Sequence, residues 1–146
     1  MRVLVLNGVN LNVLGRRDPE LYGGISIAEL ESRIYEWGHE LELSVQCRQT
    51  NSEAEFIKWI HDALDNNDGV VVNPGAWSHY AWSIHDALEM LTIPIVEVHL
   101  SNIHRREAFR HHSYVSLAAT GVICGLGAHG YVLALEAVAD LIGTPV

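Results

Sequence analysis

The sequence predicts an α/β domain in which helices cover both faces of a five-stranded parallel sheet. Three observations lead to this prediction: five short apolar runs, segments of helical period between them, and a length sufficient for one domain with a buried core. Strands that alternate with helices pair in parallel through right-handed crossovers. We therefore expect a single domain over residues 1–146.

The first half of the chain predicts two strands and two helices. Residues 2–6 form an apolar run, as expected of a buried first strand. Ser26 and Ser52 each precede a glutamate by three residues, the spacing of a capping box, so a helix is expected after each serine. Residues 41–47 alternate between apolar and polar side chains, which is typical of a half-exposed edge strand. The predicted apolar helix faces are Ile27, Leu30, Ile34, Trp37 and Leu41, and Phe56, Ile57, Ile60 and Leu64.

The second half predicts three more strands and two more helices. Strands are expected at residues 69–73 and 94–99, a strand with a glycine turn at 121–127, and helices at 80–91 and 129–142. The core-facing positions of the 80–91 helix are Ala81, Ile84, Leu88 and Leu91. An edge-like second strand and continuous apolar runs in strands one, three and four favour the flavodoxin-like order 2-1-3-4-5. The expected architecture is a three-layer sandwich.

Composition limits the location and the partners. No apolar run is long enough to span a bilayer and no leader precedes the first strand, so a cytoplasmic protein is expected. Cys47 and Cys124 lie in strand-like runs, which favours buried thiols over a disulfide or a metal pair. The net charge of −9 argues against nucleic acid or an anionic membrane as partner.

The basic residues are concentrated rather than scattered. Five of the nine Lys and Arg residues fall in two loops. They are Arg16, Arg17, Arg105, Arg106 and Arg110. The first of these loops, residues 7–24, is long enough to suggest a mobile lid. An acidic chain with two such clusters is expected to bind a small anion between them.

Polar side chains follow three strands that the predicted order makes neighbours. These strands end at Asn7, Asn73 and His99, and their carboxyl ends meet at the edge where ligands bind in open parallel sheets. Glu97 and His99 lie on the same face of their strand. They could form a structural ion pair, or the Glu97 carboxylate could orient the His99 imidazole as a general acid. The loops that leave this edge carry Asn10, Arg17, Tyr22, His79, Ser101, Arg106 and Arg110.

Simpler roles remain open for several of these residues. Asn7 and Asn73 could satisfy turn backbones, Tyr22 could anchor its loop, and His79 could cap the next helix. The further histidines of the 99–112 segment, His104, His111 and His112, fit a solvent-facing or structural role better than a catalytic one.

The motifs that this sequence lacks narrow the chemistry. Lys58 is the only lysine and belongs to a helix away from the edge, so Schiff-base chemistry is disfavoured. Neither a P-loop nor a Gly-x-Gly-x-x-Gly motif follows the first strand, so nucleotide binding is unsupported. Acid–base chemistry on a small polar anion remains. Two alternatives stay open: a metal-dependent hydrolase using His79, His99, Glu97 and a further histidine, and a non-catalytic flavodoxin-like binding module.

Several separate motifs resemble those of the type II 3-dehydroquinate dehydratases, in the same order and over nearly the whole chain. The motifs are Asn7–Arg17 with Tyr22-Gly23-Gly24; Asn73-Pro74-Gly75-Ala76 with His79; Glu97–His104 with Arg110–Ser113; and Gly121–Ile123 with Gly125-Leu126-Gly127. The resemblance implies a flavodoxin-like subunit that removes water from 3-dehydroquinate through an enolate, with anti stereochemistry. It implies no metal and no cofactor.

The resemblance also implies a role for each matching residue. Tyr22 is the base that takes the proton next to the ketone, Arg17 favours its phenolate form, and Asn10 positions a water toward the enolate oxygen. His99 is the general acid and is oriented by Glu97. The residues implied in substrate binding are Asn73, Leu100 and Ser101 for the carboxylate, His79 and Arg110 for the ring hydroxyls, and Asp86 from a neighbouring subunit.

The implied assembly is a dodecamer, a tetramer of trimers, acting in the cytoplasm in the shikimate pathway. Three departures from the family pattern concern the turn after the first strand and the subunit contact. Val9 stands where proline is usual, His85 where arginine is usual, and Trp77, Tyr80 and Trp82 make their segment unusually aromatic.

Overall fold

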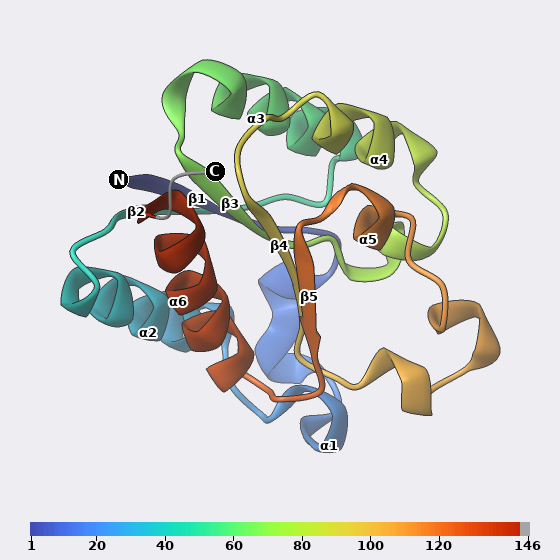
Figure 1. Ribbon diagram of the computed structural model, residues 1–146. Helices are drawn as coiled ribbons and strands as arrows, with labels where there is room; N and C mark the ends of the chain where they lie inside the picture. Colours follow the sequence, from blue (N-terminus) through green and yellow to red (C-terminus); the bar gives the residue numbers. More distant parts are fainter. Residues whose placement is uncertain (144–146) are drawn as a thin grey trace.

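The computed structural model describes residues 1–143, so the last three residues of the predicted domain lie outside the described part. Five parallel strands form one sheet in the order β2-β1-β3-β4-β5, which confirms the predicted fold class (Figure 1). Their bounds are β1 Arg2–Asn7, β2 Ser44–Gln49, β3 Gly69–Asn73, β4 Ile95–His99 and β5 Gly121–Cys124. The three central strands are almost wholly buried because helices cover both faces of the sheet.

Two apolar clusters, one on each face, hold the layers together. Helices α2 (Ile27–Glu40) and α6 (His129–Gly143) pack on one face through Leu30, Ile34 and Leu135. Helices α3 (Glu53–Asn66), α4 (Trp82–Glu89) and α5 (Val115–Ala118) cover the other face (Figure 1). Ser26 and Ser52 cap α2 and α3 by accepting the N–H groups of Glu29 and Glu55, as the capping-box spacing predicts.

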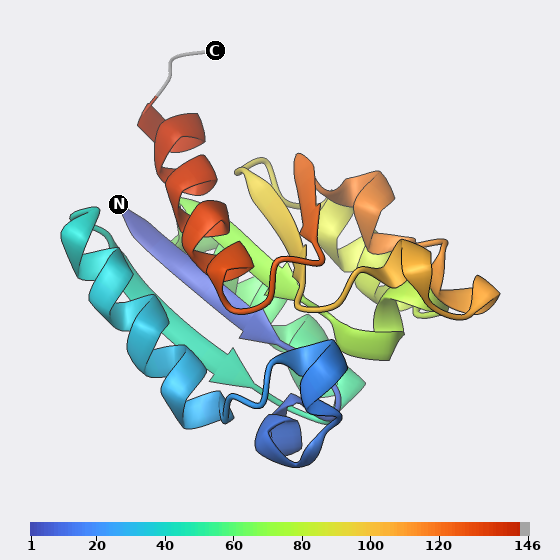
Figure 2. The same ribbon diagram turned by 90° about the horizontal axis from the view of Figure 1, so that it is seen from below.

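The short helices lie at the carboxyl edge of the sheet, beyond the arrowheads of the strands (Figure 2). They are the 3-10 helices η1 (Leu11–Arg16), η2 (Gly75–His79), η3 (Ile103–Arg105) and η4 (Ala108–Arg110), and the single-turn helix α1 (Pro19–Tyr22). The segment 7–24, expected as an irregular loop, therefore contains two short helices, η1 and α1. Within this segment the side chains of Leu11 and Leu14 are buried, while Val13 is exposed.

The structure differs from the sequence-based expectations at several element boundaries. The second strand begins at Ser44 rather than residue 41, because Glu42 takes a left-handed conformation (φ 57°) where the chain leaves α2. Residues 75–79 form η2, so the next helix starts at Trp82 rather than residue 80. Its core positions Ala81, Ile84, Leu88 and Leu91 are buried as predicted. Trp37 and Leu64, predicted on apolar faces, are 36% and 42% exposed.

Both cysteines are free and half-buried, which is less burial than the sequence led us to expect. Of the helices within residues 1–143, none is long and apolar enough to cross a membrane.

Candidate active site

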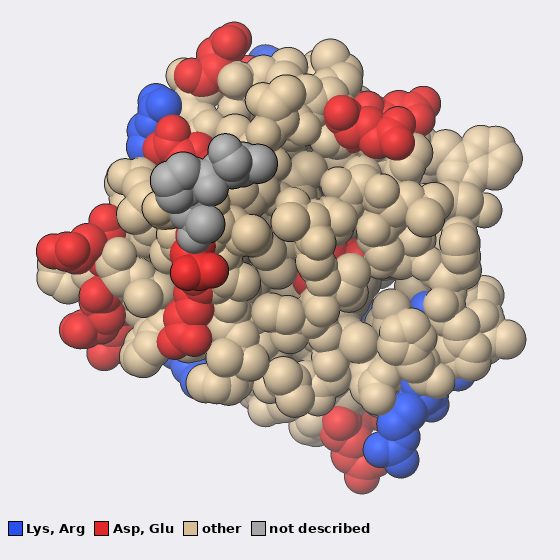
Figure 3. All heavy atoms as spheres, viewed as in Figure 1, with Lys and Arg blue, Asp and Glu red and all other residues tan. Residues whose placement is uncertain are grey.

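A pocket opens at the carboxyl edge of the sheet, between the ends of β1, β3 and β4, where the sequence predicts that polar side chains converge. Residues of the 7–24 segment form one wall, the turn after β3 forms another, and the chain that follows β4 closes the rest. The predicted site residues that line it are Arg17, Tyr22, Asn73, His79, His99, Leu100, Ser101 and Arg110. Arg106 lines it as well. In the space-filling view, the largest group of basic side chains lies at the lower right, close to the chain that follows β4 (Figure 3).

Two guanidinium groups meet at the hydroxyl of Tyr22, which is 8% exposed. Arg17 Nη2 donates to Tyr22 Oη at 2.6 Å, and Arg106 Nη1 donates to the same oxygen at 2.8 Å. The Arg17 Cζ also lies 3.9 Å from the centre of the tyrosine ring. Arg106 Nη1 further donates to Ser101 Oγ at 3.2 Å. Two charged donors therefore converge on one phenol oxygen, and such charge-assisted hydrogen bonds are stronger than bonds between neutral groups.

Positive charge accumulates in this part of the pocket. Burial lowers the pKa of Arg17, the neighbouring Arg106 and Arg110 lower it further, and only Tyr22 acts in the opposite direction. Glu107 Oε2, on the outer side, accepts from Arg110 Nε at 2.7 Å and lies 3.7 Å from Arg106 Nε. A small anion that enters the pocket would offset this positive charge.

Glu97 and His99 form a buried pair at the end of β4. Glu97 is fully buried, His99 is 5% exposed, and His99 Nε2–H donates to Glu97 Oε1 at 2.8 Å. Ser113 Oγ donates to the same carboxylate oxygen at 2.6 Å, and Ser116 Oγ donates to Oε2. Burial opposes the charge of Glu97, but these hydrogen bonds and the charge of His99 outweigh it, so the pKa of Glu97 is lowered. Because the carboxylate takes Nε2–H, His99 is held in one orientation, with Nδ1 as its second ring nitrogen.

His79 lies beside this pair. Its ring is stacked on that of His99, with centroids 6.4 Å apart and planes 17° apart. His79 Nδ1–H donates to the carbonyl oxygen of His112 at 2.8 Å, and Ala81 rather than His79 is the cap residue of α4. Burial lowers the pKa of His79, and the charges of His99 and Arg110 add to that lowering. With Nδ1–H used by His112, the second ring nitrogen Nε2 is left as an acceptor, and among residues 1–143 its one neighbour within hydrogen-bond distance is Ser78 Oγ at 3.4 Å.

Asn73 is held from two sides at the floor of the pocket. Its Oδ1 accepts from Gly75 N–H at 3.1 Å, so the turn role left open by the sequence is real. Its Nδ2 donates at 2.8 Å to the hydroxyl of Tyr131, which in turn donates to Asn7 Oδ1 at 2.6 Å. Asn7 Nδ2 is the one buried side-chain nitrogen or oxygen among residues 1–143 that has no hydrogen-bond partner. An unpaired buried donor typically costs about 1–3 kcal/mol.

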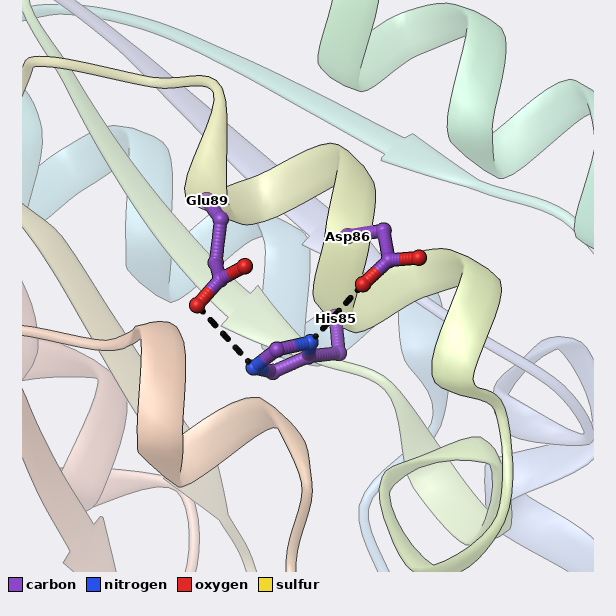
Figure 4. Close-up of side chains that lie close together, drawn as sticks. All are labelled: His85, Asp86 and Glu89. Atoms are coloured by element: carbon purple, nitrogen blue, oxygen red, sulfur yellow. Dashed lines mark hydrogen bonds and ion pairs between the residues drawn. The ribbon is translucent and has the colours of Figure 1, made fainter.

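Asn10 and Asp86 do not line the pocket of the single chain. Asn10 is exposed, takes a left-handed conformation (φ 68°), and donates its backbone N–H to Asn51 Oδ1 at 2.8 Å. Asp86 is on the outer side of α4, with its side chain 78% exposed. His85 lies between Asp86 and Glu89, 3.2 Å from one carboxylate and 3.4 Å from the other (Figure 4).

The same three residues, His85, Asp86 and Glu89, are the one group of His, Cys, Asp or Glu side chains in the described part of the chain that is close enough to share a metal ion. Glu97, His79 and His99, the ligands suggested for a metal-dependent hydrolase, are not among the described residues whose ligand atoms lie close enough together to share an ion. Glu97 and His99 instead bond each other.

Several residues of the site escape sequence reasoning. Ser113 ends one of the matched motifs but was given no role, Ser116 lies outside the motifs, and both donate to Glu97. Tyr131 looks like a core position of the last helix. Arg106 was expected at this edge among other loop residues, but its contact with Tyr22 was not predicted. The exposed His104, His111 and His112 agree with the expectation that they are not catalytic.

The strand order and this edge pocket define a flavodoxin-like α/β protein with an acid–base site for a small anion. Comparison with known proteins narrows that class. The chain matches the family described as dehydroquinase class II over residues 1–139. It belongs to the type II dehydroquinase family.

Individual relatives agree with this assignment over nearly their full lengths. The 3-dehydroquinate dehydratase of Salinispora tropica is 57% identical over 136 residues, 93% of this chain and 95% of the relative. That of Syntrophotalea carbinolica is 53% identical over 142 residues, 97% and 96% of the two chains. Among solved structures, the type II dehydroquinase from Propionibacterium acnes is similar with a TM-score of 0.93 and 53% identity, covering 95% of this chain and 96% of that one.

Proposed function

We propose that this chain, as one catalytic domain over residues 1–146, removes water from 3-dehydroquinate by anti elimination through an enolate, giving 3-dehydroshikimate. Its family makes it a hydro-lyase of the shikimate pathway. The observation that carries the proposal is the placement of Tyr22 between Arg17 and Arg106 in the pocket that also contains His99. A biosynthetic role of this kind fits a cytoplasmic location.

Tyr22 is the base. An ordinary phenol is only about 0.1% ionised at pH 7, so it needs stabilisation of its anion to act at useful rates. Hydrogen bonds from two guanidinium groups provide that stabilisation. The phenolate takes the proton from the carbon next to the ketone. Since the ketone itself makes that proton acidic, neither a metal nor a Schiff base is required for this step.

His99 is the acid. It donates a proton to the departing hydroxyl as the enolate collapses, so the carbon–oxygen bond breaks and water leaves. Glu97 keeps the imidazole in place, because its buried carboxylate accepts a hydrogen bond from Nε2 at 2.8 Å. Anti elimination requires Tyr22 and His99 to act from opposite faces of the substrate ring.

The remaining groups of the pocket hold the substrate. The Asn73 amide and the Leu100–Ser101 segment bind its carboxylate, and His79 and Arg110 bind the ring hydroxyls. Burial of these groups strengthens each polar contact relative to the same contact in water.

Two contributions come from the margins of the pocket. Asn10, at the start of η1, directs a water toward the enolate oxygen. Asp86 reaches the substrate of a neighbouring subunit in a dodecamer built as a tetramer of trimers. The exposed positions of Asp86 on α4 and of Trp82, which is 66% exposed, support a subunit contact at that helix.

The activity is tested by adding 3-dehydroquinate to the purified protein and following the ultraviolet absorbance of the conjugated enone product. The reaction should proceed equally with and without EDTA, and borohydride added with substrate should leave Lys58 unmodified. No absorbance change in the presence of intact, folded protein would refute the proposal and favour the binding-module alternative. Loss of turnover on chelation would favour the metal-dependent hydrolase.

A further inference from the structure

We propose that Tyr131 is a positioning residue that fixes the direction of the Asn73 amide and thereby the affinity of the pocket for the substrate carboxylate. The inference rests on the proposed function, in which Asn73 binds that carboxylate. It assigns a role to a side chain of α6 that does not line the pocket itself.

The hydroxyl of Tyr131 can bond the two asparagines in only one way. Tyr131 is fully buried, and burial raises its pKa, so the hydroxyl keeps its single proton near neutral pH. That proton is donated to Asn7 Oδ1 at 2.6 Å. Toward Asn73 the hydroxyl has only lone pairs, so it accepts from Asn73 Nδ2, 2.8 Å away.

The second constraint on Asn73 comes from its own turn. Gly75 N–H, 3.1 Å away, requires an acceptor and therefore faces Oδ1 of Asn73. With Oδ1 used by Gly75 and one N–H used by Tyr131, a single N–H of the amide is left to bind a ligand. Because Asn73 lines the pocket, this remaining donor is the one that meets the substrate carboxylate. Without Tyr131, one hydrogen bond would hold the amide instead of two.

The unpaired nitrogen of Asn7 supports this reading. Asn7 and Asn73 are register partners at the ends of β1 and β3, and both are buried. An aliphatic residue at position 7 would avoid the orphaned Nδ2, yet it would also remove the acceptor that takes the Tyr131 proton. The amide at position 7 is thus explained by the bond that it makes to Tyr131.

The test compares Tyr131→Phe with the unaltered protein in steady-state kinetics. Losing one of two bonds that orient a donor to a carboxylate should raise KM on the order of tenfold, with kcat within about threefold of its original value. Val138→Ala, which removes buried packing seven residues further along the same helix, serves as the matched control. It should lower the melting temperature and leave KM unchanged. An unchanged KM in Tyr131→Phe, or an equal rise in Val138→Ala, would overturn the proposal.

Poor folding of Tyr131→Phe is addressed by a second variant. In Asn7→Leu/Tyr131→Phe the amide that loses its partner is also removed, so stability should recover while the raised KM persists. Recovery of the original KM in the double variant would show that folding, and not the Asn73 amide, caused the effect. The single variant Asn7→Leu keeps the acceptor for Asn73 and should change KM by less than about threefold.

A measurement without ligand separates this inference from the proposed function. The side-chain NH2 signals of Asn73, assigned by nuclear magnetic resonance, should shift and exchange faster in Tyr131→Phe than in the unaltered protein. If the unaltered protein shows no turnover, the proposed function fails, while the Asn73 signals still decide whether Tyr131 fixes the amide. Unaltered Asn73 signals in Tyr131→Phe would refute the role of Tyr131 even in a fully active enzyme.

Discussion

Arg106 Nη1 lies 2.8 Å from the hydroxyl of Tyr22, although 84 residues separate the two in the chain. Arg17, only five residues from Tyr22, reaches the same oxygen from within its own segment. The local arginine moves with the tyrosine, whereas Arg106 belongs to the segment that follows β4. The second contact therefore exists only when the 7–24 segment is docked against the rest of the pocket.

Tyr22→Phe should lower kcat by about 10²–10⁴-fold, because it removes the base and keeps the ring. Substrate affinity should change little, since the carboxylate and hydroxyl contacts lie elsewhere in the pocket. Arg106→Ala and Arg17→Ala should each lower kcat, because each removes one charged donor to the Tyr22 oxygen. Steady-state kinetics of the three variants and the unaltered protein measures these effects. An unchanged kcat in Arg106→Ala would show that Arg17 alone activates the tyrosine.

His99→Ala should also reduce kcat by about 10²–10⁴-fold while the protein stays folded. Glu97→Gln should be milder, because it disturbs the orientation of the imidazole more than its supply of protons. Circular dichroism confirms folding, and single-turnover measurements separate chemistry from product release. Near-normal turnover in His99→Ala would mean that the leaving hydroxyl receives its proton from another group.

Glu97 also makes stability depend on pH at the acid end. Its pKa in the folded protein lies below the ordinary value of 4.5, so the unfolded chain takes up its proton first as the pH falls. The stabilisation from ionised Glu97 is therefore complete above about pH 4.5 and is lost as the pH falls through the lower folded pKa. Urea unfolding of the unaltered protein and of Glu97→Gln at a series of pH values isolates this component, since the other carboxyl groups are common to both. If the unfolding free energies of the two proteins changed with pH in parallel, Glu97 would not contribute to the acid dependence of stability.

The 7–24 segment should open and close as a lid. Arg16 is exposed, and trypsin is expected to cut after Arg16 or Arg17 in the free protein. Quinate, which keeps the carboxylate and ring hydroxyls of the substrate but has no ketone, should slow the cleavage by favouring the closed form. Arg16→Gln shows which bond is cut. Equal cleavage rates with and without quinate would show that the segment does not respond to the ligand.

The contact at Asp86 can be tested by mixing two inactive proteins. Tyr22→Phe chains lack the base, and Asp86→Ala chains lack the residue that is supplied to a neighbour. Refolded together, they should regain part of the original activity, because some sites then combine Tyr22 of one chain with Asp86 of another. Light scattering should show a large oligomer for each. A monomer at micromolar concentration, or no recovery on mixing, would remove Asp86 from the site.

The fold and the location of the site could be predicted from sequence because both depend on short-range patterns. Apolar runs, capping serines and the strand order suffice to bring Asn73, His99 and the 7–24 segment to one edge. The hydrogen bonds that hold Glu97 and Asn73 in place could not be predicted, because they join residues far apart in the chain that belong to no functional pattern. Nothing in the sequence around Ser113 or Ser116 points to Glu97, and Tyr131 has the periodicity of any core residue in a helix. The first residues of β2 and α4 differ from the predicted ones because local backbone conformation interrupts the side-chain pattern. At Glu42, for example, the backbone is left-handed.

The burial of Glu97 links the completion of the sheet to chain that is synthesised later. An ionised carboxylate inside β4 is costly until its hydrogen-bond donors arrive, and Ser113 and Ser116 follow it by 16 and 19 residues. His99 donates to Glu97 from within β4, but the other two donors reach the carboxylate only when the segment through α5 packs against that strand. The hydrogen-bonding capacity of the buried charge is therefore satisfied only by contacts between separate parts of the chain, which couples the geometry of the Glu97–His99 pair to the packing of α5.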